Sequence, residues 1–314
     1  MQPNSAPLDR DAIAAAAARL QAGELVAMPT ETVYGLAADA RNLDAVRKIY
    51  ALKGRPVDHP LIVHLAPEAS LADWAAEVPP AALQLAARYW PGPLTLILKR
   101  APSVLDAVTG GQDTVGLRKP AHPVAQALLR AFGGGLAAPS ANRYGQISPT
   151  RAEHVREEFG AAAPLILEGG AAAVGIESTI VDLSGEQPRL LRPGAISRSE
   201  LESLLGPLAL IGDHEGPRAS GRVLTHYAPR TPLRLATVGE APRPGCVYLS
   251  RKIDQWQAPG MALPDDPEGY ARDLYDALRS LDRRGADAII VRPLPDGAEW
   301  EAVRDRLSRA AAPR

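Results

Sequence analysis

The spacing of apolar residues predicts alternating strands and helices through the first two-thirds of the chain. Apolar side chains recur three or four positions apart over Leu43–Tyr50 and Val124–Phe132, the period of a helix buried on one face. The run Ala12–Ala18 predicts another helix, and a hydroxyl in Ser148–Thr150 is expected to cap a helix over Arg151–Phe159. Mixed order of this kind is typical of an α/β domain built around a twisted sheet. The expected strands are Glu24–Pro29, Leu61–Leu65, Leu94–Leu98, Thr114–Arg118, Leu136–Ala138, Leu165–Leu167, Thr179–Leu183 and Arg189–Arg192.

The pattern breaks near Gly206. From there to Pro229 the sequence is rich in Gly and Pro and has no sustained period, which is typical of a connecting segment. After it, helices are expected over Tyr270–Leu281 and Trp300–Leu307, and strands over Leu233–Val238, Cys246–Leu249 and Ala288–Val291. We therefore divide the chain into a larger α/β domain (8–205), a connecting segment (206–229) and a small, Rossmann-like α/β domain (230–314).

Composition places the chain among globular proteins. Its 314 residues fit about two domains, and a hydrophobic content of 46% permits a buried core and excludes disorder. Lys plus Arg (35) nearly balance Asp plus Glu (36), so any anionic ligand must be bound by a local cluster of cations. An aromatic content of 4% argues against a stacking platform for single-stranded nucleic acid.

Cysteine content and the N-terminal sequence exclude further classes. Cys246 is the only cysteine, which excludes an intramolecular disulfide and a cysteine-based zinc site. The run Ala12–Ala18 is too short to cross a bilayer, and its charged flanks do not fit a signal peptide. We therefore expect a soluble, cytoplasmic protein without membrane contact.

Polar clusters follow the expected strands, and strand ends are where α/β folds bind ligands. The common nucleotide signatures, a P-loop or a Rossmann glycine motif, do not occur in the sequence. The clusters are PTETVYGL (29–36), KGRP (53–56) with Lys48 nearby, TVGLRKPAHP (114–123), PSANRYGQISPT (139–150), and GIESTIVD (175–182) followed by RLLRPG (189–194).

Each cluster, taken alone, has a plainer alternative. The first could be a turn in which Thr30 or Thr32 caps the next element. The cations of the second fit phosphate oxygens, but they could equally end a solvated helix. Arg118 could bind a carboxylate through two parallel hydrogen bonds or be an ordinary surface arginine. Ser178 as a nucleophile would need histidine and carboxylate partners, which the sequence does not reveal, so this reading is disfavoured.

In this order and spacing, the clusters resemble the YrdC-like family of L-threonylcarbamoyladenylate synthases, from about Leu8 to the segment containing HYAP (226–229). Residues 230–314 match the C-terminal domain of the long members in length and pattern. The resemblance implies a YrdC-like twisted mixed sheet. It also implies a nucleotidyltransferase that joins L-threonine, bicarbonate or CO2, and ATP into threonylcarbamoyl-AMP, with release of pyrophosphate, for tRNA modification. Positioning and charge stabilisation suit this chemistry, and no protein nucleophile is required.

The resemblance also implies roles for single residues. Asn142 is expected to order its loop, and Mg²⁺ to arrive on the ATP phosphates rather than at a protein metal site. The length and the Gly and Pro content of 206–229, apart from the resemblance, predict that this segment folds over the site when the substrates bind. Lys53 and Arg55 are expected to be catalytic through charge stabilisation. The residues expected to hold L-threonine are Thr32, His64, Arg118, Ala138 (by its backbone) and Ser178. Those expected to hold ATP are Lys53, Arg55, His59, Thr114, Ser140, Ser148, Arg192 and Tyr227.

Two positions depart from the family pattern. His59 stands where members commonly have Asn, so this position gains a pH dependence. The segment SGRVLTHYAP lacks the Pro-Gly and the lysine often found there, and Arg222 is expected to replace the lysine.

Partners and competing functions follow from the same residues. The machinery that transfers the threonylcarbamoyl group to tRNA is an expected partner, whereas direct tRNA binding is disfavoured by the net charge of −1. Two alternatives stay open: an RNA-binding module, and a carbamoyl or adenylyl transferase that uses another amine.

Overall fold

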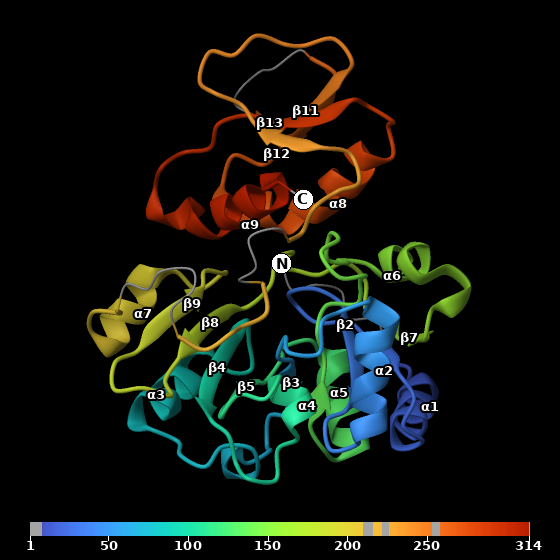
Figure 1. Ribbon diagram of the computed structural model, residues 1–314, viewed down its shortest axis with the longest axis vertical. Coiled ribbons are helices and arrows are strands. Elements are labelled where there is room, and N and C mark those ends of the chain that lie inside the picture. The colour runs from blue at the N-terminus through green and yellow to red at the C-terminus, as the bar shows by residue number, and fades with distance from the viewer. Residues whose placement is uncertain (1–7, 210–215, 222–225, 253–257, 314) are drawn as a thin grey trace.

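The computed structural model describes residues 8–209, 216–221, 226–252 and 258–313, so Arg222 lies outside the described residues. Within them the chain forms a larger unit around a nine-stranded sheet and a smaller unit around a four-stranded sheet. Figure 1 shows the smaller unit on one end of the larger one, with its helices facing the larger unit. The expected α/β class is confirmed for both units.

The larger sheet is mixed and has the strand order β7-β1-β2-β6-β3-β5-β4-β8-β9. β1–β7, β3–β5 and β4–β8 are parallel pairs, and the other neighbours are antiparallel. Strands from distant parts of the sequence therefore end side by side near the middle of the sheet. The strands are β1 (Val26–Met28), β2 (Gly35–Asp39), β3 (Ile62–His64), β4 (Leu94–Lys99), β5 (Thr114–Arg118), β6 (Leu136–Ala137), β7 (Leu165–Ile166), β8 (Thr179–Asp182) and β9 (Arg189–Arg192).

Helices cover this sheet, and local signals set their ends. Asn42 accepts the backbone N–H groups of Asp44 and Ala45 at the start of α2, and Gly54 ends that helix at φ +62°. The turn at Gly54 ends the helix after Lys53, and Arg55 begins the loop that leads to β3. The helices are α1 (Arg10–Gln21), α2 (Leu43–Lys53), α3 (Pro80–Tyr89), α4 (Asp106–Thr109), α5 (Pro123–Phe132), α6 (Ala152–Phe159) and α7 (Arg198–Leu205), with 3-10 turns at Leu71–Asp73 and Gly160–Ala162.

The smaller sheet is parallel throughout and has the order β10-β13-β11-β12. Its apolar core also includes Val33, Ile147 and Ile176 of the larger unit, so the two units share buried surface. The elements are β10 (Leu233–Leu235), β11 (Cys246–Arg251), β12 (Gly260–Leu263), α8 (Pro267–Asp282), β13 (Ala288–Val291), a 3-10 turn (Ala298–Trp300) and α9 (Glu301–Ala311).

The structure corrects several details of the expected elements, and α3, α4 and α7 were not expected. β2 and β12 were not expected, because their sequences GLAAD and GMAL lack the β-branched run that marks a strand. The strand expected over Leu233–Val238 ends at Leu235. No hydroxyl caps α6: its flanking residue Arg151 makes no side-chain cap, and the N–H of Thr150 donates instead to Nδ1 of His154.

Candidate active site

One cavity collects most of the residues with expected roles. It lies at the ends of the central strands and is covered by Ser220, Gly221, His226 and Tyr227 of the connecting segment. Side chains and backbone from five separate sequence clusters therefore meet in one place. The residues with expected roles that line it are Thr32, Arg55, His64, Arg118, Ala138, Ser140, Ser178, Arg192 and Tyr227.

The remaining expected residues lie around this cavity rather than on its wall. The Lys53 amine is buried behind it and donates to the carbonyls of Ser140 (2.6 Å) and Asn142 (2.5 Å). His59 contacts the hydroxyl of Tyr144. Two more residues lie close by without lining it. Thr114 lines a neighbouring small cavity, and Ser148 donates to Glu177 at 2.5 Å.

Two short loops shape the wall of the cavity. The Thr30 hydroxyl accepts the N–H groups of Thr32 and Val33 and donates to the Val33 carbonyl, which folds the PTETVYGL segment into a tight turn. Asn142 donates to the carbonyls of Arg143 (2.8 Å) and Gln146 (2.9 Å). Its expected role in ordering the loop agrees with these bonds.

Arg118 ends β5 and is paired with an internal carboxylate. Its Nη2 lies 2.7 Å from Oε1 of Glu31, whose other oxygen accepts the N–H of Ala121. Both side chains are buried. Among the described residues, Nε of Arg118 is buried without a hydrogen-bond partner. The guanidinium thus keeps an unsatisfied donor beside the cavity, which suits a second anionic group.

Arg192 and Arg55 complete the cationic wall. Arg192 donates to the carbonyl of Ser178 (3.0 Å), to its hydroxyl (3.1 Å) and to the carbonyl of Ser220 (2.8 Å). Arg55 donates to the hydroxyl of Ser220 at 3.1 Å and to the carbonyl of Pro60 at 2.9 Å. Both guanidiniums therefore bind the covering segment to the sheet, and both line the cavity.

Sequence reasoning assigned no role to Glu177 and His226 of this wall, or to Glu31, which pairs with Arg118. Glu31 and Glu177 lie inside the quoted motifs, and His226 precedes Tyr227 in HYAP. The signal available in the sequence was a carboxylate beside a buried strand, because a buried carboxylate costs free energy unless a cation pairs with it. In Glu177, burial alone raises the pKa of the carboxyl, but Arg306 and Arg192 outweigh it and lower that pKa to about 2.

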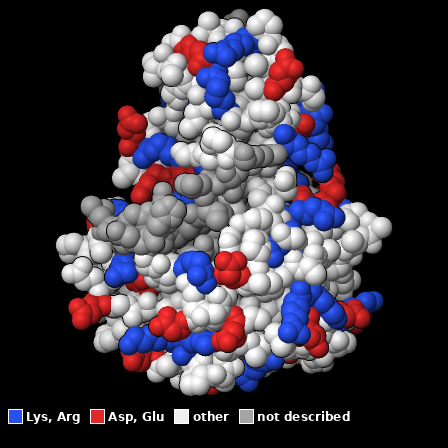
Figure 2. Space-filling view, in the orientation of Figure 1, with Lys and Arg blue, Asp and Glu red and all other residues white. Residues whose placement is uncertain are grey.

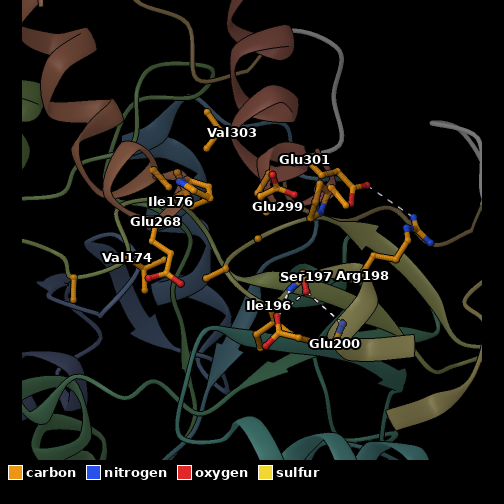
Figure 3. A pocket seen from close by; sticks show the side chains of 18 residues that line it. Val174, Ile176, Ile196, Ser197, Arg198, Glu200, Glu268, Glu299, Glu301 and Val303 are labelled. Atoms are coloured by element: carbon orange, nitrogen blue, oxygen red, sulfur yellow. Dashed lines mark hydrogen bonds and ion pairs between the residues drawn. The ribbon is translucent and has the colours of Figure 1, made fainter. Parts of the chain in front are cut away.

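The cavity is small, and a larger one lies elsewhere. Its volume of about 40 Å³ holds about three water molecules. A cavity of about 320 Å³ separates α7 from α8 and α9, with Val174, Ile176 and Val303 in its wall and Glu268 and Glu299 beside it (Figure 3). No residue with an expected role lines this larger cavity. The candidate chemistry therefore belongs to the smaller one.

Surface charge and metal ligands add little to the site. On the face seen in Figure 2, basic and acidic side chains are mixed over both units. Within the described ranges, no three His, Cys, Asp or Glu side chains gather in a way that could hold a metal ion. The same ranges contain no helix long and apolar enough to span a membrane.

Comparison with known protein families decides the assignment. The model of the Sua5/YciO/YrdC family, described as "Telomere recombination", matches residues 18–194. The chain belongs to the Sua5/YciO/YrdC family. A second model, described as the C-terminal domain of threonylcarbamoyl-AMP synthase, matches residues 196–312. The resemblance inferred from the sequence motifs is confirmed.

Individual Sua5/YciO/YrdC relatives match nearly the whole chain. The threonylcarbamoyl-AMP synthase of Bacillus subtilis is 41% identical over 326 residues, which cover 96% of this chain and 93% of that protein. The enzyme of the same name from Pyrococcus abyssi is 40% identical over 94% of this chain and 93% of its own length. The crystal structure of P. abyssi Sua5 complexed with L-threonine superposes with a TM-score of 0.91 at 37% identity, covering 98% of this chain and 96% of that one. The expected YrdC-like fold with a small C-terminal domain is confirmed.

Two buried histidines in this Sua5/YciO/YrdC site predict acid sensitivity. Burial lowers the pKa of His64 to about 3, with Arg118 adding to the effect, and burial likewise lowers that of His226 to about 3. Because the folded state keeps them neutral, they stabilise the fold above pH 6.5 and this stability is lost as the pH falls toward 3. At pH 5 we expect each to reduce the free energy of unfolding by about 2 kcal/mol.

Urea unfolding at pH 7 and pH 5 measures this loss. Replacing His226 by Gln should reduce the difference in the free energy of unfolding between pH 7 and pH 5 by about 2 kcal/mol, the contribution of one histidine. An unchanged difference in His226→Gln would mean that the side chain titrates freely in the folded protein.

Proposed function

We propose that this chain synthesises threonylcarbamoyl-AMP from L-threonine, bicarbonate or CO2, and ATP, for the modification of tRNA. The observation that carries the proposal is a single cavity lined by the guanidiniums of Arg55, Arg118 and Arg192 together with threonine and serine hydroxyls. The substrates are anionic through their phosphates and carboxylates, and guanidinium groups bind both with charge-assisted hydrogen bonds. Relatives about 40% identical that carry this enzyme name support the proposal.

The reaction needs two bond-forming steps. The amine nitrogen of threonine adds to the carbon of CO2 and loses a proton, which gives a carbamate. A carbamate oxygen then attacks the α-phosphorus of ATP, and pyrophosphate leaves with the electrons of the broken P–O bond. Fixed cations stabilise the charge that develops on the phosphate oxygens, and the wall holds the reactants in line. No covalent intermediate with the protein is required.

Roles follow from the position of each cation. Arg118, with its unsatisfied Nε, takes the threonine carboxylate. The rest of the threonine molecule is held by lining residues near Arg118: Thr32, His64, Ala138 (by its backbone) and Ser178. Arg55 and Arg192 take phosphate oxygens, together with Ser140. ATP is also held by four residues that lie just behind this wall: Lys53, His59, Thr114 and Ser148. Mg²⁺ enters on the ATP phosphates as part of the substrate.

The covering segment must move for the substrates to enter, because a cavity of about 40 Å³ is too small for threonine or ATP. We assign residues 8–205 to catalysis, 206–229 to this cover and 230–314 to the small domain. Tyr227, a buried residue of this segment, then closes over the nucleotide and excludes water from a labile mixed anhydride. The cytoplasmic location and the transfer machinery as partner remain predictions.

Gly221 offers a direct test of the cover. It has φ +83°, and a Cβ there would lie 2.2 Å from the Tyr227 hydroxyl oxygen and 3.1 Å from Nη1 of Arg192. We expect Gly221→Ala to push Tyr227 out of place, so that the adenylate product is released and hydrolysed about 10-fold faster, a change of about 1.4 kcal/mol.

Gly216→Ala is the matched control. Gly216 has a similar φ of +76°, but its nearest neighbour would be Nη1 of Arg189 at 3.4 Å, away from the cavity. Chromatography measures how much adenylate product each variant retains per ATP consumed. Equal product retention in both would remove Tyr227 from the proposed cover.

A panel of amines tests the proposed substrate. Labelled bicarbonate should enter an adenylate with L-threonine, and much less with serine or with amines that lack a carboxylate. Equal incorporation with other amines would favour the alternative of a transferase with a different acceptor. Tight RNA binding without any such product would favour the RNA-binding alternative.

A further inference from the structure

Arg306 reaches from the small unit into the wall of the proposed active site. It projects from α9 and is fully buried, and its Nε donates to Oε2 of Glu177 at 2.8 Å. Its Nη2 donates to the carbonyl of Pro193 at 3.0 Å and approaches the Glu177 carbonyl at 3.4 Å. Nη1 pairs with Asp305 at 2.6 Å. One side chain therefore connects the ends of β8 and β9 to the second unit.

The atoms that Arg306 holds adjoin residues of the cavity. Glu177 directly precedes Ser178 in the chain, and Pro193 directly follows Arg192. Ser178 and Arg192 both line the cavity and are hydrogen-bonded to each other. A displacement of either strand end would therefore move a proposed substrate contact.

Tyr275 of α8 acts on the same carboxylate and on the cover. Its hydroxyl donates to Oε2 of Glu177 at 2.9 Å, and its ring stacks on Tyr227, with ring centres 5.8 Å apart. The Arg306 guanidinium lies 5.2 Å from the centre of the Tyr227 ring. Ser148 fills the other side of the carboxylate by donating to Oε1 at 2.5 Å. Glu177 is thus held by one residue from each of α8, α9 and the loop before α6.

A buried carboxylate is costly unless it is paired and hydrogen-bonded. Arg306 and Tyr275 donate two of the three side-chain hydrogen bonds that the described residues make to the Glu177 carboxylate, and both belong to the small unit. Without them, Glu177 would turn toward Arg192 or toward water. A turn toward Arg192 would draw that guanidinium away from Ser178 and Ser220.

We propose that Arg306 and Tyr275 are positioning residues of the active site, through which the small unit completes it. They hold Glu177, and through it Ser148, Ser178 and Arg192, in the arrangement that binds threonine and ATP, and they support the ring of Tyr227 in the cover. The proposal rests on the function proposed above.

The charge around Glu177 predicts a pH signature. The titratable and charged groups that face it are Arg306 and Asp305 of α9, Tyr275 of α8, Arg192 of β9, and His226 and Tyr227 of the cover. Loss of the Arg306 charge lets burial raise the pKa of Glu177. The acid limb of activity should then move up by about 1–3 pH units from its wild-type position, so that the variant loses activity before the wild type does as the pH is lowered.

The experiment compares threonine-dependent pyrophosphate release in four full-length variants. Arg306→Gln should lower kcat/KM for threonine about 10- to 100-fold and shift the acid limb. Arg306→Lys keeps the charge but not both donor directions, so its acid limb should match the wild type while its kcat/KM falls by less than about 10-fold. Tyr275→Phe, which loses one hydrogen bond and keeps the ring stack, should fall about 10-fold.

Arg283→Gln is the matched control, because Arg283 also joins the two units. It pairs with Glu157 at 3.0 Å, with both side chains more than half exposed and away from the cavity. This variant should match the wild type in rate and pH profile. If Arg306→Gln does not fold, Arg306→Lys and Tyr275→Phe decide the question.

Each outcome supports or overturns the proposal. Wild-type kinetics and pH profile in Arg306→Gln, or in both Arg306→Lys and Tyr275→Phe, would overturn it. An equal loss in Arg283→Gln would also overturn it, since the effect would then be interface packing alone. A wild-type protein that releases no pyrophosphate with threonine would instead contradict the proposed function, and that result is distinct from the other two.

Discussion

Arg118→Gln should raise the KM for threonine about 10- to 100-fold, because it removes a charge-assisted hydrogen bond worth about 1.5–3 kcal/mol. Arg118 lines the cavity, is buried, and within the described structure has no partner on Nε. The KM for ATP should change much less, since Arg55 and Arg192 remain. Steady-state kinetics with each substrate varied in turn measures both values.

Stability must be separated from binding at this position. Glu31 lies 2.7 Å from Arg118, and leaving a buried carboxylate without its cation costs about 3–5 kcal/mol. The double variant Arg118→Gln/Glu31→Gln replaces the ion pair with two amides and should regain most of that stability, as measured by urea unfolding. Its threonine KM should stay high. A double variant that recovers wild-type threonine binding would show that Arg118 serves the fold and not the substrate.

The second large effect concerns the phosphates. Arg55→Gln should raise the KM for ATP about 10- to 100-fold and that for threonine less, because its guanidinium lines the cavity beneath Ser220. The same substitution removes the bond to the Ser220 hydroxyl, so the cover should also loosen. Titration of ATP by calorimetry measures the loss directly.

Lys48 provides the control for this experiment. It belongs to the same cationic cluster of the sequence, but it is exposed, and its amine donates to the Gly23 carbonyl at 2.6 Å, away from the cavity. Lys48→Met should therefore leave ATP binding unchanged. If Arg55→Gln binds ATP as well as Lys48→Met does, Arg55 is a structural residue at the end of α2.

Most of the larger sheet could be predicted from local pattern, because its strands are short apolar runs between turn residues. β2 was missed because it is buried and built from small residues, so no alternation marks it, and the turn formed by Thr30 precedes it directly. Without β2 the expected sheet lacked the strand that pairs with both β1 and β6. Small buried strands of this kind depend on tertiary packing, which local propensity does not record.

The cavity could be predicted in its cations but not in its carboxylates. Motifs identified Arg55, Arg118 and Arg192 because cations at strand ends have an obvious use. The role of Glu177 depends on Arg306, which lies 129 positions later in the sequence. No local signal in α9 distinguishes Arg306 from the exposed arginines of other helices. Contacts between distant segments of this kind are set by the fold as a whole.

Pyrophosphate release from ATP, measured with each reactant omitted in turn, tests the central claim most directly. The cavity is proposed to join threonine, bicarbonate and ATP in one reaction, so release should require all three and should fall to background when any one is left out. Threonine should appear in an adenylate in the same amount as the pyrophosphate formed. Pyrophosphate release at the same rate without threonine or without bicarbonate would contradict the account.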